Sequence, residues 1–222
     1  MLRSGIKSRS TPSNAVLLYQ RTDCPFCWKV RLAIAVLELD CDIIEITLGQ
    51  KHPDVLRLSP TGSVPILVDN EMAIWESAVI LEYLDQRYGP RLFSVDAAES
   101  ARIRLLHTYS DKSVGPSLRD LVFEKRSKPE SAWDREIIQA SELKWSSCLD
   151  WLEKNHVTGK LPNAADCALA ARFGVAEAYG AAVTGEHPRL SNWYRTFKSQ
   201  PAWQAAYPVS FIQYEQQLDN GQ

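Results

Sequence analysis

The sequence predicts a two-part fold, an α/β domain followed by an all-α helical bundle domain. Up to residue 89, apolar residues alternate between strand-like and helix-like spacing, in the order β-α-β, β-hairpin and α. Such an order forms a small mixed sheet covered by helices. After Phe93 the strand-like runs stop, and the remaining apolar repeats have helical spacing. We therefore place the α/β domain at residues 15–89, a linker at 90–96 and the helical domain at 97–222.

Each element of the α/β domain has its own local signal. Short runs rich in apolar and β-branched residues indicate strands, and Asp69-Asn70-Glu71 indicates a tight turn between two of them. Pro25 suits the first position of a helix, because its missing N–H would be unpaired there anyway. Gly89-Pro90 ends the last helix of this domain. The expected strands are residues 15–19, 41–48, 64–68 and 73–75, and the expected helices begin at Pro25 and Ser77.

The helical domain opens with a long pattern over residues 97–126, in which Gly115-Pro116 predicts a kink or break. Asn163 followed by Asp166 resembles a capping box, which satisfies free backbone donors at a helix start. The helix that follows is apolar nearly all round, and this is typical of the middle of a bundle. Further helical patterns cover residues 131–155, 189–198 and 202–207.

The composition is that of a globular protein with little net charge. The chain has 222 residues, a net charge of -2 and 45% hydrophobic residues. This net charge gives no reason to expect nucleic acid or an anionic membrane as partner. The chain also contains no apolar run long enough to span a bilayer. Five cysteines at unrelated spacings fit a reducing compartment, so we expect a cytoplasmic protein. The first dozen residues are Ser-rich and basic, and we favour a flexible polar tail over residues 1–14 to a transit peptide.

The residue with the clearest chemistry is Cys24, the first cysteine of Cys24-Pro25-Phe26-Cys27. It stands at the start of a helix, where unpaired N–H groups and the positive end of the helix dipole stabilise a thiolate. The pKa of such a thiol falls between about 3.5 and 7.5. Cys27 lies one turn further on, has lost most of this stabilisation and faces inward. We therefore expect Cys24 to attack, while Cys27 is either a resolving thiol or a buried bystander.

The cysteine pair has two other interpretations. Half of a zinc site would need a second pair of cysteines or two closely spaced histidines, and the four histidines are scattered, so we expect no metal. If both were ordinary core cysteines, neither Pro25 nor the position of Cys24 at a helix start would be explained. The other cysteines, Cys41, Cys148 and Cys167, lie in apolar surroundings and are expected to be inert core residues.

Two further features stand at the ends of predicted elements. Pro65 suits either an edge strand with a trans peptide bond or a cis bond in a tight corner, and trans is the commoner outcome. With a cis bond, the backbone of the preceding residue would be free to pair with an extended ligand. Glu76-Ser77 lies at a helix start, where Ser is first of all a cap, and the same N-terminus can bind a carboxylate.

Together these segments resemble a known family. Cys-Pro-Phe-Cys at 24–27, Gly-Ser-Val-Pro at 62–65 and Glu-Ser-Ala-Val-Ile-Leu-Glu-Tyr-Leu at 76–84 look like the thioredoxin-like domain of a cytosolic glutathione transferase. In the helical half, residues 162–169, 188–193 and 200–203 are similar to the same family. The resemblance covers residues 15 to about 207 and, with a cysteine at the reactive position, points to the omega-like and glutaredoxin-like members.

The resemblance implies a role for individual residues. Cys24 would form a mixed disulfide with glutathione, the cosubstrate, and the backbone of Val64 before Pro65 would pair with its cysteinyl part. Glu76 and Ser77 would hold the γ-glutamyl end. A lysine near the glycyl carboxylate is implied at Lys51, although a lysine exposed for solubility fits this position nearly as well. The candidate glutathione-binding residues are Phe26, Lys51, Val64, Pro65, Glu76 and Ser77, and the candidate catalytic residues are Cys24 and Cys27.

The chain departs from the family pattern in two places. Omega-like members usually have another residue in place of Cys27, so a dithiol route is open here. Tyr19 ends the first strand, close to where tyrosine-class members keep an activating hydroxyl, and a packing role is favoured for it.

Three functions are therefore open. The first is a glutathione-dependent thiol transferase or reductase, and the second is a transferase that conjugates glutathione to electrophilic small molecules. The third is a non-catalytic partner protein of the stringent starvation protein A type. We expect the second substrate between the domains, bounded by residues of the first long helix, and the resemblance implies a homodimer. The residues expected to bound that substrate are Tyr109, Ser113, Arg119 and Phe123.

Overall fold

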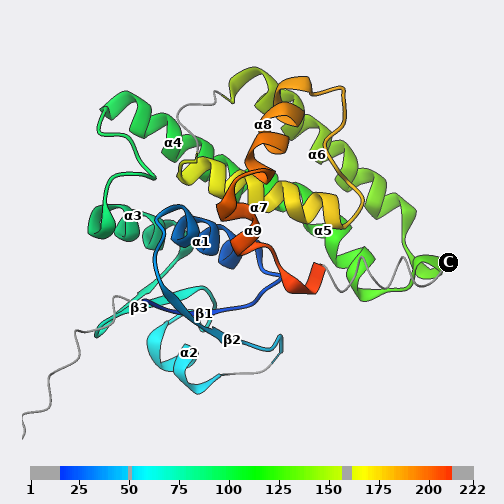
Figure 1. Ribbon diagram of the computed structural model, residues 1–222. Coiled ribbons are helices and arrows are strands. Elements are labelled where there is room, and N and C mark those ends of the chain that lie inside the picture. The colour runs from blue at the N-terminus through cyan, green and yellow to red at the C-terminus, as the bar shows by residue number, and fades with distance from the viewer. Residues whose placement is uncertain (1–15, 50–51, 157–161, 212–222) are drawn as a thin grey trace, which may run out of the picture.

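The computed structural model of the chain describes residues 16–49, 52–156 and 162–211 (Figure 1). The expected polar tail at residues 1–14 and the candidate residue Lys51 lie outside the described residues. Within the described part, no helix is both long and apolar enough to cross a membrane.

The α/β part is built on a four-stranded mixed sheet with the order β2-β1-β3-β4. The strands are β1 (Val16–Gln20), β2 (Cys41–Glu45), β3 (Ile66–Asp69) and β4 (Met72–Trp75). β1 pairs with β2 in parallel and with β3 in antiparallel orientation, and β3 and β4 form the hairpin. The predicted fold class, a βαβ unit followed by a ββα unit and then a helical bundle, is confirmed. β2 is shorter than predicted and ends at Glu45, ahead of Gly49, whose positive φ of 82° belongs to a turn.

The two faces of the sheet pack against different helices, because successive side chains of a strand point to opposite faces. Leu18 and Leu67 belong to the large core, which they share with residues of α1 (Pro25–Val36) and α3 (Ser77–Tyr88). On the opposite face, Tyr19 and Ile66 form a small cluster with Val55 of α2 (Pro53–Leu58). In Figure 1, α2 accordingly lies on the side of the sheet away from α1 and the helical part.

The connection from the α/β part to the helical part is organised by one buried carboxylate. α3 ends at Tyr88 and α4 (Ala97–Tyr109) begins at Ala97. Oδ1 of Asp85 accepts hydrogen bonds from the backbone N–H groups of Arg91, Leu92 and Phe93, at 2.8, 2.6 and 3.3 Å. The turn after α3 therefore has its donors satisfied although it is partly buried.

The predicted interruption of the long helix takes the form of a π-helical segment. It lies directly before Gly115-Pro116, where the kink or break was expected. The segment Ser110–Val114 joins α4 directly to α5 (Gly115–Ser127). Pro116 has no N–H, and its ring would clash with the carbonyl four residues earlier, so the regular hydrogen-bond ladder cannot continue through it. A wider turn accommodates the proline without ending the helix.

The rest of the helical part surrounds α7 (Ala164–Ala178), of which nearly every residue is buried. The predicted capping box is confirmed: the Asn163 side chain accepts from the N–H of Asp166, and the Asp166 side chain accepts from the N–H of Asn163. Asp166 also accepts a hydrogen bond from Trp193 Nε1 at 2.8 Å. The other elements of the helical part are α6 (Arg135–Asn155), α8 (Pro188–Lys198), α9 (Pro201–Ala206) and the short 3₁₀ helix Glu130–Ala132.

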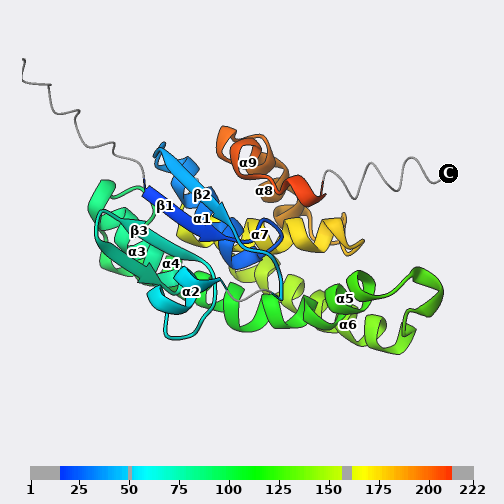
Figure 2. The same ribbon diagram turned by 90° about the horizontal axis from the view of Figure 1, so that it is seen from below.

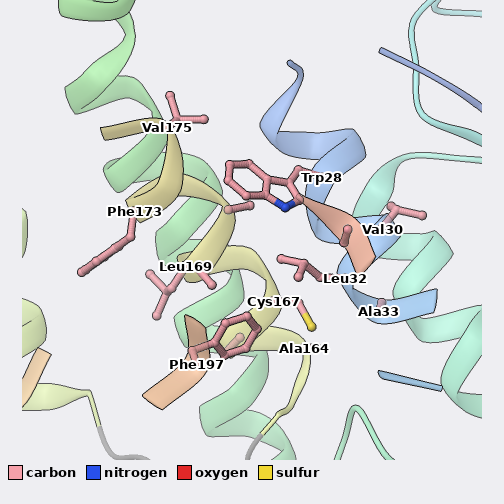
Figure 3. Packing of buried hydrophobic residues seen from close by; sticks show 14 of the residues in the cluster. Trp28, Val30, Leu32, Ala33, Ala164, Cys167, Leu169, Phe173, Val175 and Phe197 are labelled. Carbon is pink, nitrogen blue, oxygen red and sulfur yellow. The ribbon is translucent and has the colours of Figure 1, made fainter. Parts of the chain in front are cut away.

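The two parts share one apolar core, in which α1 lies between the sheet and α7. Figure 2 shows the sheet in front of α1 and α7 when the molecule is seen from below. Trp28 of α1 is fully buried, and its ring contacts Trp203 of α9 at a centroid distance of 4.9 Å. In Figure 3 the Trp28 indole lies against α7, near Val175. The relative position of the two parts is therefore set by aromatic packing around α1.

We expect Gly174→Ala to destabilise the protein, because a Cβ at this position of α7 would lie 2.2 Å from the Trp28 ring and 2.9 Å from the Trp203 ring. The gain in helix propensity is about 1 kcal/mol, whereas overpacking a core costs about 1–3 kcal/mol or more. Urea unfolding should therefore show a lower midpoint. Gly185→Ala is the matched control, since a Cβ there meets nothing within 4 Å. Equal stabilities of the two variants would contradict this account of the interface.

Candidate active site

Cys24 occupies the N-cap position of α1, with an extended backbone conformation, and Pro25 follows as the first helical residue. Its backbone is held on both sides, since its N–H donates to Arg21 O at 3.2 Å and its carbonyl accepts from Trp28 N–H at 2.8 Å. The side chain is partly exposed, whereas Cys27 is fully buried. The first-turn N–H groups of α1 are therefore available to the Cys24 sulfur.

The two thiols of the motif have opposite electrostatic environments. The Cys27 thiol donates a hydrogen bond to the Cys24 sulfur, the backbone N–H groups of Cys27 and Phe26 also donate, and the Arg21 charge is nearby. These interactions outweigh burial and lower the pKa of Cys24 to about 6. Burial and the neighbouring Cys24 raise the pKa of Cys27 well above that of an ordinary thiol. At neutral pH the geometry gives one thiolate, on Cys24, beside one protonated thiol.

We expect the alkylation rate of Cys24 by iodoacetamide to rise with pH through a midpoint near 6, because only the thiolate reacts and the pKa is about 6. In Cys27→Ala the donated hydrogen bond is lost, so the midpoint should move toward the ordinary thiol value of about 8.5. Peptide mass spectrometry after timed labelling follows Cys24 specifically. Cys41→Ser should leave the midpoint unchanged, and an unchanged midpoint in Cys27→Ala would disprove the role given to the Cys27 thiol.

The sheet register brings four of the predicted glutathione-binding residues, Val64, Pro65, Glu76 and Ser77, to the same edge as Cys24. Tyr19 of β1 is opposite Ile66 of β3, and Ile66 is opposite Trp75 of β4. The loop to Cys24 leaves β1 just after Tyr19, Val64-Pro65 precedes Ile66, and Glu76-Ser77 follows Trp75. The Val64-Pro65 peptide bond is cis, the less common of the two predicted outcomes. Glu76 has a positive φ of 68°, and Ser77 is buried as the first residue of α3.

Tyr19 lies apart from the reactive thiol. Its side chain lies on the face of the sheet that packs against α2, away from α1, and its hydroxyl donates to Asp54 Oδ2 at 3.4 Å. Burial and the Asp54 charge raise its pKa, which is the opposite of what an activating hydroxyl needs. The packing role favoured for Tyr19 is what the structure shows.

The remaining cysteines are distributed through the fold as free thiols. Cys167 is fully buried and burial raises its pKa, while Cys148 is also buried. Cys41 is only partly buried, and burial raises its pKa to about 11. Among the described residues, no group of three or more His, Cys, Asp and Glu side chains is arranged to hold a metal ion.

A cleft of about 320 Å³ opens beside Cys24, between the start of α1 and the helical part. Of the residues expected to bound a second substrate, Arg119 and Phe123 line this cleft. Tyr109 and Ser113 do not, and for them the expectation was wrong. Tyr109 comes before the π-helical segment, and its ring packs on Trp151 at a centroid distance of 4.3 Å.

A buried charged cluster behind Cys24 was not predicted. Lys29 of α1 is 1% exposed, and its Nζ lies 2.6 Å from Asp111 Oδ2 and 2.8 Å from His107 Nε2. Arg172 of α7 contacts the other Asp111 oxygen at 3.4 Å, and its guanidinium lies 4.4 Å from the centre of the Phe26 ring. Asp111 lies in the π-helical segment and thereby joins α1 to α7. A lysine and an arginine inside otherwise apolar helices were the available signals in the sequence.

This buried cluster has a net positive charge, and it lies near the Cys24 thiol. Burial and the nearby Lys29 charge lower the pKa of His107 to about 4, so this imidazole is neutral at physiological pH. Lys29 and Arg172 then face one carboxylate, Asp111, and both cations interact electrostatically with Cys24. A thiolate at Cys24 compensates this excess, which adds to the stabilisation from the helix start.

The fold and the thiol define a class: a thioredoxin-like sheet with a cysteine of lowered pKa at a helix start, joined to a helical bundle. Residues 18–92 match the family described as the glutathione S-transferase N-terminal domain. A probable glutathione transferase from Aplysia californica is 30% identical over 90 residues, which are 40% of this chain and 98% of the relative. The chain belongs to the cytosolic glutathione transferase superfamily.

Other relatives cover the chain to different extents. Glutathione S-transferase omega-2 of Mus musculus is 26% identical over 86% of this chain and 78% of the relative. A stringent starvation protein A homolog from Haemophilus influenzae is 30% identical over 51% of this chain, and the match spans about half of that relative, 54%. Among solved structures, a glutathione S-transferase from Rhodospirillum rubrum has a TM-score of 0.78 and 25% identity, over 90% of this chain and 99% of the other.

Proposed function

We propose that the protein is a glutathione-dependent thiol transferase that acts through a mixed disulfide between Cys24 and glutathione. The observation that carries the proposal is the Cys24 thiol, partly exposed at the N-cap of α1 with a pKa lowered to about 6. A thiolate of this kind is both present at neutral pH and accessible to a disulfide. Membership of the glutathione transferase superfamily supports glutathione as the cosubstrate.

The reaction consists of two exchanges. The Cys24 thiolate attacks the glutathionyl sulfur of a mixed disulfide; a Cys24–glutathione disulfide forms, the substrate S–S bond breaks, and the other thiol leaves as a thiolate that takes a proton from solvent. The thiolate of a second glutathione then attacks the glutathionyl sulfur on Cys24. Glutathione disulfide leaves, and Cys24 returns as a thiolate. The substrate disulfide is reduced, and the two glutathione units leave as the oxidised dimer.

The tripeptide would be held along the sheet edge that carries Val64, Pro65, Glu76 and Ser77. The backbone of Val64 would pair with the cysteinyl part, and the first N–H groups of α3 at Ser77 would receive the γ-glutamyl carboxylate. Phe26 is 37% exposed at the mouth of the cleft and would contact the tripeptide from the side of α1. Cys27 would either resolve the mixed disulfide or serve only as a donor to Cys24.

Incubation with oxidised glutathione, followed by intact-mass measurement, tests the proposal. The wild type should gain one glutathionyl group that reduced glutathione removes, and Cys24→Ser should gain none. Conjugation of glutathione to an electrophile that survives Cys24→Ser would instead favour the conjugating transferase. Absence of any glutathione binding would favour a partner protein, a candidate supported by the Haemophilus influenzae relative.

We also infer a homodimer and a cytoplasmic location. Exposed apolar side chains on the consecutive elements β4, α3 and α4 support the homodimer, and they are Met72, Trp75, Val79 and Leu105. Five free thiols support a reducing compartment.

A further inference from the structure

The cleft beside Cys24 is lined by more positive than negative side chains. Four arginines line it, from the loop before Cys24, from α5 and from α7, against two aspartates. The other lining groups are largely apolar and include Pro116, Val122 and Phe123. A ligand that fits this lining has an apolar body and carries negative charge.

Both aspartates are already paired with cations. Both oxygens of Asp23 accept a hydrogen bond from Arg21 Nη2, at 2.9 and 3.0 Å, and Asp23 Oδ2 lies 2.8 Å from Arg126. Asp111 is shared between Lys29 and Arg172. Neither carboxylate is therefore available to compensate a further arginine.

Among the arginines that line the cleft, Arg119 makes no ion pair with a carboxylate of the described residues. Its guanidinium lies 5.6 Å from the centre of the Phe123 ring, one turn further along α5. Arg126 stands on the same face of α5, seven residues on, which is about 10 Å along the helix axis. The ion pair between Arg126 and Asp23 connects the C-terminal part of α5 to the loop before Cys24. Arg119 lies nearer the start of α5, on the same helix face, and lines the cleft there.

Most cations around the cleft have an anionic neighbour. The Cys24 thiolate compensates the excess of the buried cluster formed by Lys29, Asp111 and Arg172. Arg21 and Arg126 share the single carboxylate of Asp23, so one positive charge is left over there as well. The remaining cation is Arg119, whose planar guanidinium suits a two-pronged contact with a carboxylate.

We infer that the second substrate is an anionic acceptor: a disulfide of glutathione with a thiol that has an apolar, preferably aromatic, body and a carboxylate at its far end. This inference rests on the proposed function. Phe123 and the neighbouring apolar side chains of α5 contact the body, and Arg119 contacts the carboxylate. Arg119 is thus a specificity-determining residue, and it leaves the chemistry at Cys24 unchanged.

The test compares two disulfides of glutathione that differ only in charge, one with 4-(mercaptomethyl)benzoate and the other with 4-(mercaptomethyl)benzamide. The wild type should favour the benzoate in kcat/KM by about 5- to 10-fold, as expected for a partly exposed contact with a charged group. In Arg119→Gln the ratio should fall to about one, because the benzoate loses more in kcat/KM than the benzamide does. Added salt should reduce the wild-type ratio, because the contact is solvent-accessible.

Arg102→Gln is the matched control, since it removes an exposed arginine of α4 that does not line the cleft, and it should keep the wild-type ratio. A wild-type ratio near one, or a ratio that Arg119→Gln leaves unchanged, would overturn the inference while the benzamide turnover still supports the proposed function. Titration calorimetry with 4-methylbenzoate and 4-methylbenzamide keeps the test independent of turnover. Equal affinity for the two would overturn the inference as well.

Discussion

Cys24→Ser should lower the turnover of a glutathione mixed disulfide by at least about 10³-fold, because a serine hydroxyl forms no anion at neutral pH and cannot exchange with a disulfide. The partly exposed position of Cys24 at the start of α1 makes a loss of this size independent of folding. Coupled measurement of glutathione disulfide formation gives the rate, and calorimetry with reduced glutathione shows whether the tripeptide still binds.

The loss must be specific to this cysteine. Cys41→Ser is the control, because Cys41 is also partly exposed but burial raises its pKa to about 11, so it should keep full activity. Turnover of the mixed disulfide by Cys24→Ser within about tenfold of the wild type would show that the nucleophile lies elsewhere.

Asp111→Ala should destabilise the protein by about 3–5 kcal/mol, because it leaves a lysine and an arginine buried with an uncompensated charge. The side chain of Lys29 is only 2% exposed in this pair, and the contact links α1 to the helical part. Urea unfolding followed by tryptophan fluorescence measures the change. The exposed pair of Arg135 and Glu130 is the control, and Glu130→Ala should change stability by less than about 1 kcal/mol.

The pH dependence of the Asp111→Ala deficit gives a second check. Burial already lowers the pKa of Lys29, and Asp111 opposes that effect, so the pKa falls further when Asp111 is removed. At pH values between the lowered pKa of Lys29 in the folded variant and its higher pKa in the unfolded chain, the unfolded chain binds more protons than the folded one. The free energy of unfolding of the variant therefore rises with pH in this range. The deficit relative to the wild type should therefore narrow as the pH rises toward the ordinary lysine pKa of about 10.4. A deficit that is small and constant with pH would contradict the account of the cluster.

The elements whose signals are local could be predicted from the sequence. The capping box of Asn163 and Asp166 depends on a spacing of three residues, and it appears in the structure as predicted. Pro25 and the apolar repeat after it were enough to place Cys24 at a helix start. The strand order also followed the predicted β-α-β and hairpin pattern, since consecutive elements of this kind have few ways to pair.

The parts that depend on distant contacts could not be predicted. Lys29 and Asp111 are 82 residues apart, and Asp111 and Arg172 are 61 apart. Two cations within apolar helices therefore give no local sign of the carboxylate with which they pair. The cleft has the same origin: Arg119 and Phe123 face it, but Tyr109 on the preceding helix is turned away toward Trp151. A single sequence contains no local signal for which helix face meets the thiol.

A crystal structure of the protein soaked with oxidised glutathione tests the central claim most directly. The account predicts a disulfide between Cys24 Sγ and the glutathione sulfur, with the tripeptide against the Val64 backbone and its γ-glutamyl carboxylate at the start of α3. Glutathione bound there with its sulfur unbonded and Cys24 reduced, or glutathione bound away from this edge of the sheet, would contradict it.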